Sequence, residues 1–180
     1  MALQPNLAQL SAEVIDEYVT ASDLCIHHRK LDGGCLGYPT VLLLFCTVEA
    51  LGNYLSPKEP LAVLNDPLFG KSYSVTKIKN LRNWYRHLLA HAAIIAPGIC
   101  LTPEPEGEPF DFEGDEPVRL RVIPFHRMVR AAWHAFDKEL LKPETRLRDK
   151  HYRTQPNAKE SLKVPDGSSA APFVFKPTKM

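Results

Sequence analysis

An arginine and a histidine five positions apart, Arg86 and His91, are the residues of this chain best suited to chemistry on a phosphate. A guanidinium stays charged at any physiological pH and can donate two parallel hydrogen bonds to phosphate oxygens. An imidazole can accept or donate a proton near neutral pH. Together, the two groups could stabilise a charged phosphate while a proton moves, which is what phosphodiester cleavage requires.

Three further polar residues accompany this pair: His87 lies between Arg86 and His91, and Arg82 and Asn83 precede it. On an ideal helix each residue advances by about 100°, so Arg86 and His91 lie about 140° apart around the axis. Both fall on the polar side of the expected helix, with Asn83 and His87 between them. We therefore expect a wide polar face that opens onto a cleft or onto a second copy of the chain.

The net charge of +1 conceals a strong segregation of charge along the chain. Residues 71–103 contain five basic and no acidic side chains, whereas residues 104–117 contain seven acidic and no basic ones. A locally positive stretch around Arg86 and His91 is what a phosphate-binding surface would need. The alternative is that these charge runs are simply solvated faces.

The elements expected to position these residues are helical. Apolar positions recur at helical spacing in four segments, with Ser11 as the N-cap of the first and Pro97-Gly98 stopping the third. The expected helices cover residues 11–31, 39–54, 74–95 (starting at Ser74 or Val75) and 124–141. The second helix is apolar on nearly every side and is therefore expected to be the most buried. A short helical turn is expected at residues 61–64.

One carboxylate interrupts the apolar second helix. Glu49 is costly to bury unless it has a partner, so it should reach the helix edge or meet a cation such as Arg82 or Arg86.

Residues 109–112 and 118–122 flank an acidic turn that contains glycine, which predicts a β-hairpin at about residues 109–122. The resulting fold prediction is all-α: four main helices with an inserted hairpin and an irregular C-terminal tail. Residues 1–142 would form the helical domain. Residues 143–180, first basic and then rich in Pro, Ser and Gly, have a composition that disordered segments share.

The cellular compartment is predicted from the lack of a membrane-spanning segment and of a signal peptide. The longest apolar run, residues 41–46, is too short to cross a bilayer, and no signal peptide is recognisable at the N-terminus. The cysteines have no CxxC spacing, and two of them lie among aliphatic residues, which suits reduced thiols that fill a core; the four are Cys25, Cys35, Cys46 and Cys100. We expect a cytoplasmic protein that does not bind a membrane.

Two groups of residues could suggest zinc. His87 and His91 are four apart on one helix, but Leu88 stands where an HExxH site has its glutamate. A second group shares a spacing that matches no common zinc module; it contains Cys25, His27, His28 and Cys35. We therefore expect neither a metal nor any other cofactor.

The segment from Tyr85 to Ala92, with Arg82-Asn83 before it and Pro97-Gly98 after it, resembles the signature motif of HEPN domains. That motif is an arginine, a polar residue, a short spacer and a histidine. The resemblance implies a HEPN-like helical bundle. It also implies a metal-independent endoribonuclease of the kind found among toxins and in defence systems, whose active site is built by two subunits. RNA, a second copy of the chain and an antitoxin are the implied partners.

The resemblance also implies roles for individual residues. His91 would act as general acid or base, and Arg86 would stabilise the charge that develops on the phosphate. His87 and Asn83 would orient the phosphate or His91, and Glu49 would hold Arg86 in position.

Two alternatives remain open. Arg82 and His87 have the same spacing as Arg86 and His91, so the register of the motif is ambiguous, although we prefer Arg86 and His91. The fold could also serve as a non-catalytic helical module that binds a nucleotide or another protein.

Overall fold

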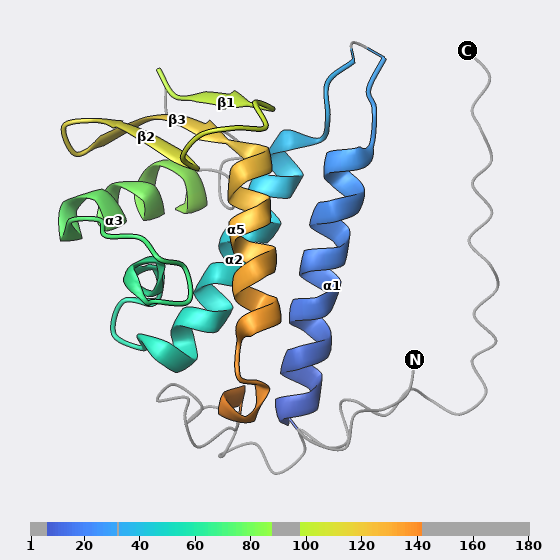
Figure 1. Cartoon of the computed structure of the whole chain (residues 1–180), viewed down its shortest axis with the longest axis vertical. Helices are drawn as coiled ribbons and strands as arrows, with labels where there is room; N and C mark the ends of the chain where they lie inside the picture. Colours follow the sequence, from blue (N-terminus) through green and yellow to red (C-terminus); the bar gives the residue numbers. More distant parts are fainter. Residues whose placement is uncertain (1–6, 32, 88–97, 142–180) are drawn as a thin grey trace, which may run out of the picture. The chain divides into compact units, whose positions relative to one another are not determined.

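The computed structural model describes residues 7–31, 33–87 and 98–141, all of which belong to one compact unit of the chain (Figure 1). The helices and helical turns are α1 (Leu7–His27), α2 (Gly37–Leu55), the 3-10 turn η1 (Pro60–Asn65), α3 (Val75–Leu81), the π-helical turn η2 (Arg82–His87), α5 (Val122–Ala135) and the 3-10 turn η3 (Lys138–Leu141). The strands are β1 (Cys100–Thr102), β2 (Phe110–Glu113) and β3 (Glu116–Arg121).

Helix α2 lies at the centre of the core, as its apolar sequence predicts. It contacts α1, α5, η1 and η2, and Figure 1 shows α1 and α5 running alongside it. Its fully buried side chains include Val41, Phe45 and Val48, each 0% exposed. Because α2 meets so many elements, residues at its rim are well placed to hold side chains from neighbouring segments.

The prediction of an all-α fold is wrong, because the described residues also form a three-stranded mixed sheet. The predicted hairpin is confirmed as the antiparallel pair of β2 and β3. The third strand, β1, pairs in parallel with β3 through the register Cys100 to Arg119. A strand of three residues leaves no readable alternation, and its partner is distant in the sequence, so local patterns could not reveal it.

Several helix boundaries differ from the prediction; for example, α1 ends at His27 and not at residue 31, and α5 begins at Val122 and not at residue 124. Helix α1 begins at Leu7, so Ser11 lies inside it rather than at its N-cap; the Ser11 hydroxyl instead accepts a hydrogen bond from Tyr54 at 3.2 Å. The last helix ends at Ala135, because Phe136 adopts an extended backbone with ψ of 131°, and η3 follows.

The third predicted helix is only partly described. Ser74 is its N-cap, as expected, and its hydroxyl accepts a hydrogen bond from the Lys77 backbone N–H at 3.1 Å. The α-helix gives way to the π-helical turn η2 after Leu81. The remainder of the prediction, from residue 88 onwards, lies outside the described residues, as do residues 142–180 with the predicted tail.

The four cysteines are free thiols, as expected, but they do not fill the core. Cys25, Cys35 and Cys46 are half-buried and Cys100 is exposed. The expectation that cysteines among aliphatic residues fill the core is therefore not confirmed, because none of the four is fully buried.

A buried histidine joins α5 to α1. His126 is only 6% exposed, and its Nε2 atom lies 3.6 Å from Oδ1 of Asp23 without a hydrogen-bond partner among the described residues. Burial lowers the pKa of His126 below its ordinary value of 6.5, Asp23 opposes this shift, and the nearby charge of Arg130 adds to it, as do His27 and Arg127 to smaller extents. The folded protein therefore favours the neutral imidazole.

This histidine should make folding stability depend on pH. The folded state binds fewer protons at His126 than the unfolded state, so its contribution is fully present above pH 6.5 and is lost as the pH falls below that value. The loss cannot exceed about 1.4 kcal/mol per pH unit for one proton. Urea titrations between pH 7.5 and 5.5 should show this decline, with a smaller slope in His126→Gln. The exposed His134, changed to Gln, should leave the slope as it is; an unaltered slope in His126→Gln would refute the assignment.

Candidate functional site

Arg86, the first residue of the motif, lies in η2 and forms an ion pair with Glu49 of α2. Nε of Arg86 donates a hydrogen bond to Oε2 of Glu49 at 2.7 Å, and the two side chains are 25% and 23% exposed. The prediction that Glu49 meets a cation is thus confirmed. The Nη groups of Arg86 make no hydrogen bond to another described residue. A guanidinium held through Nε keeps both Nη groups for a bidentate anion.

A second ion pair lies one turn away in the same segment. Nη1 of Arg82 donates to both carboxylate oxygens of Glu59, at 3.1 and 2.8 Å, and Nε of Arg82 is buried without a partner among the described residues. The sequence pattern predicts no role for Glu59 in this site. It lies in the Pro-containing connection after α2, and nothing in that local pattern links it to an arginine 23 positions later.

A glycine allows this connection to approach α2. A Cβ atom at Gly52 would lie 1.9 Å from the carbonyl oxygen of Pro60, so only glycine permits the close contact. Gly52 follows Glu49 by about one helical turn, and Pro60 directly follows Glu59. The two carboxylates that receive Arg86 and Arg82 are therefore brought to the same part of the molecule by this contact.

The turn that carries both arginines is anchored by Tyr85. This residue is 0% exposed, and its ring stacks on Phe45 of α2 with centroids 5.9 Å apart and planes 25° apart. A π-helical turn, with its bonds between residues five apart, departs from the regular helix that the sequence suggested and is often found at functional sites. Because His91 lies outside the described residues, the structure does not decide between the two registers of the motif.

Cys46 lies on α2 one turn before Glu49 and borders the Glu49–Arg86 pair. Burial raises the pKa of the Cys46 thiol, the charge of Arg86 lowers it and that of Glu49 raises it again. The net shift is upward, so the thiol stays neutral at physiological pH. Cys46 is therefore a neutral neighbour of the Glu49–Arg86 ion pair and contributes no charge to it.

Not every residue predicted for the site is described. Asn83 is half-buried in η2, and His87 is the last residue of that turn. His91 lies outside the described residues, so the distance between Arg86 and the expected acid or base stays a prediction. The structure brings together Arg82, Arg86 and Glu49, and adds Glu59.

The positive stretch around the motif is largely neutralised within the chain. Lys71 pairs with Glu108 at 2.6 Å, and Arg82 and Arg86 have the carboxylate partners described above. The ammonium of Lys77 lies over the ring of Phe112 at 4.7 Å, whereas Lys79 is exposed. The site is thus a set of positioned arginines rather than a surface of high positive charge.

The acidic stretch finds its partners in the sheet. Arg121 donates hydrogen bonds to Asp111 at 2.7 Å and to Glu104 at 2.8 Å. The hydrogen bond from Arg121 holds the pKa of Asp111 below its usual value. These contacts tie the segment before β2 to β3, so the acidic run has a structural role and is more than a solvated face.

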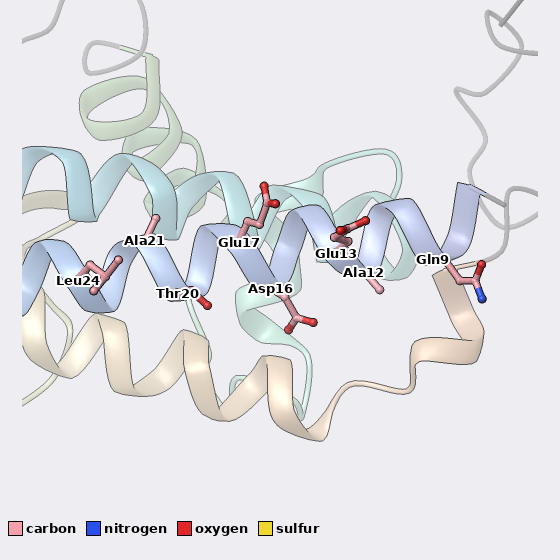
Figure 2. A pocket seen from close by; sticks show the side chains of 8 residues that line it. All are labelled: Gln9, Ala12, Glu13, Asp16, Glu17, Thr20, Ala21 and Leu24. Carbon is pink, nitrogen blue, oxygen red and sulfur yellow. The ribbon is translucent and has the colours of Figure 1, made fainter. Parts of the chain in front are cut away.

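A shallow depression of about 640 Å³ lies on the outer side of α1, remote in sequence from the motif (Figure 2). Its lining comes entirely from α1 and includes three carboxylates, those of Glu13, Asp16 and Glu17. The side chain of Asp16 also accepts a hydrogen bond from Nε1 of Trp133 in α5. A depression edged by carboxylates repels phosphate, so it does not compete with the arginine pair as a site for nucleic acid.

The described residues include neither a metal-binding cluster nor a helix that could span a membrane. They contain no group of three or more His, Cys, Asp or Glu side chains that could hold a metal ion, which includes the Cys25 to Cys35 segment considered above. Within the same ranges, no helix combines the length and apolarity that crossing a membrane demands. Comparison with protein-family models, with curated proteins and with solved structures gives no match.

Proposed function

We propose that this chain is a metal-independent endoribonuclease whose activity is similar to that of HEPN nucleases. The observation that supports the proposal most is the Glu49–Arg86 ion pair, in which a carboxylate holds Nε of the motif arginine and, among the described residues, neither Nη group has a hydrogen-bond partner. Guanidinium groups fixed in this way act at developing negative charge without reorganising during the reaction. The proposal concerns the motif and its chemistry, not an all-helical fold.

The reaction would be transesterification at a ribose. The 2′-oxygen loses its proton, attacks the adjacent phosphorus and forms a new bond, while the bond to the 5′-oxygen breaks. The leaving 5′-oxygen takes up a proton, so the products are a 2′,3′-cyclic phosphate and a 5′-hydroxyl. Arg86 would stabilise the charge on the non-bridging oxygens, and His91 would take or give one of the two protons.

Two proton transfers favour two histidines, which is a physical reason for a homodimer that combines two motif segments. His87 and Asn83 would orient the phosphate or His91. As part of this proposal, the protein acts on RNA in the cytoplasm, as a toxin or defence nuclease, with an antitoxin as a further partner.

A second function is favoured by one specific observation. Both motif arginines already have carboxylate partners within the chain, which is also what a purely structural role would produce. A non-catalytic module that binds a nucleotide or a protein would keep the same pairs and would cut nothing.

The proposal is tested with purified protein, single-stranded RNA and excess EDTA. We expect cleavage with 2′,3′-cyclic phosphate ends, and no cleavage of DNA of the same sequence, because DNA lacks the attacking 2′-hydroxyl. His91→Ala should abolish cleavage if the preferred register holds, whereas His87→Ala should do so in the alternative register. Intact RNA with the wild-type protein, at a concentration that binds it, would leave the binding module as the function.

A further inference from the structure

We propose that the site contacts two consecutive phosphates of one RNA strand, with Arg86 at the phosphate that reacts and Arg82 at its neighbour. This inference rests on the proposed function, because it assigns the substrate of the same site. It identifies the ligand as a single-stranded oligonucleotide with at least two linkages, rather than a mononucleotide.

The spacing of the two arginines fits this ligand. They are four residues apart within η2. Four residues of a helix advance by roughly 6 Å along the axis, and somewhat less where the turn is π-helical. Consecutive phosphates of a nucleic-acid strand are separated by a similar distance. The backbone spacing of Arg82 and Arg86 is therefore compatible with one strand that runs along the turn and contacts both side chains.

The two guanidiniums are held in place from different directions. Glu49 of α2 binds Arg86 through Nε, and Glu59, before η1, binds Arg82 through Nη1. The Arg82 and Arg86 side chains remain 33% and 25% exposed, so solvent and ligand can reach them. Among the described residues, each carboxylate contacts only one nitrogen of its arginine, which leaves Nη2 of Arg82 and both Nη groups of Arg86 for phosphate oxygens.

The carboxylates also explain why two contacts are needed. Each arginine shares its charge with a glutamate, so a single phosphate gains little electrostatic energy at either position. A strand that reaches both positions makes the second contact intramolecularly, and its affinity exceeds that of either contact alone. The arrangement therefore favours an oligonucleotide over free nucleotides, which a surface of unpaired lysines would not.

Binding of uncleavable ligands tests the inference independently of catalysis. The ligands are fluorescent 2′-O-methyl trinucleotides of one sequence, in which both linkages are charged or either one is a neutral methylphosphonate. For the wild-type protein, we expect neutralising either linkage to weaken binding. It should also reduce the slope of log K against log salt concentration by about 0.7, the value for one contact in a single strand.

Variants assign the second contact to Arg82. In Arg82→Gln, one of the two linkages should lose its effect on affinity, while the other keeps it. Lys79→Gln removes an exposed charge from a nearby position of the chain and should keep the response to both linkages. If Arg82→Gln does not fold, the double variant Glu59→Gln/Arg82→Gln removes the whole ion pair and takes its place.

The inference is overturned if wild-type affinity depends on only one linkage or on neither, or if Arg82→Gln still responds to both. Cleavage of a longer RNA in EDTA is measured in parallel. Cleavage without a response to the second linkage would overturn this inference and leave the proposed function standing. A response to both linkages without cleavage would uphold the contact and refute the nuclease.

Discussion

Arg86→Ala is expected to lower kcat/KM for RNA cleavage by about 10²–10³-fold, the usual loss when one preorganised donor to a developing charge is removed. The reason lies in the geometry of the Glu49–Arg86 pair, which fixes Nε and, within the part of the chain that the structure describes, leaves both Nη groups without a hydrogen-bond partner. Arg86→Lys should recover only part of the activity, because a lysine cannot donate two parallel hydrogen bonds. Initial rates with a fluorescent RNA in EDTA provide the measurement.

The matched control is Arg130→Ala. Arg130 is also an arginine that interacts with one carboxylate, since its Nη1 atom lies 3.6 Å from Asp23. It lies on α5, however, and takes part in neither of the two arginine–glutamate ion pairs of the site. The rate of RNA cleavage by Arg130→Ala should stay near that of the wild type. Equal losses in Arg86→Ala and Arg130→Ala would show that the effect comes from general stability or charge, and would remove Arg86 from the chemistry.

Gly52→Ala is expected to destabilise the protein strongly. The added Cβ would lie 1.9 Å from the carbonyl oxygen of Pro60, so the backbone of one element must move. Alanine is favoured over glycine inside a helix by about 1 kcal/mol, but overpacking of this kind costs about 1–3 kcal/mol and sometimes more. The clash involves two backbones that cannot rotate away, so we expect a net loss near the upper end. Urea unfolding followed by circular dichroism measures it.

Gly37→Ala serves as the control in the same helix. A Cβ at Gly37 would meet only a methyl group of Val122 at 3.8 Å, which is ordinary contact. Its free energy of unfolding should be unchanged or slightly higher. If Gly52→Ala is as stable as Gly37→Ala, the close approach of Pro60 to α2 is not present in solution, and the placement of Glu59 beside Arg82 fails with it.

Some of this fold and site could be predicted because the signals are local or chemically compelling. The apolar run of α2 predicts a buried helix, and the glycine-containing acidic turn predicts the hairpin of β2 and β3. Glu49 could be linked to Arg82 or Arg86 because a carboxylate inside an apolar helix needs a cation. The structure selects Arg86.

Other features depend on contacts between distant residues. Strand β1 forms through its parallel pairing with β3, and the close approach of Pro60, the residue after Glu59, to α2 requires a glycine at position 52. The π-helical turn at Arg82–His87 is anchored by Tyr85 against Phe45, a contact that no local propensity specifies. The ideal-helix angles used for the motif therefore do not transfer directly to the folded chain.

The proposed guanidinium and imidazole should act together on one ribose linkage, and a DNA strand with a single ribonucleotide tests this most directly. With the ribonucleotide of each base in turn, and with excess EDTA, the wild-type protein should cut once, on the 3′ side of the ribose, and leave a 2′,3′-cyclic phosphate. Arg86→Ala should cut the strand about 10²–10³-fold more slowly, and His91→Ala should leave it intact. Cleavage at deoxyribonucleotides, or undiminished cleavage by either variant, would contradict the account.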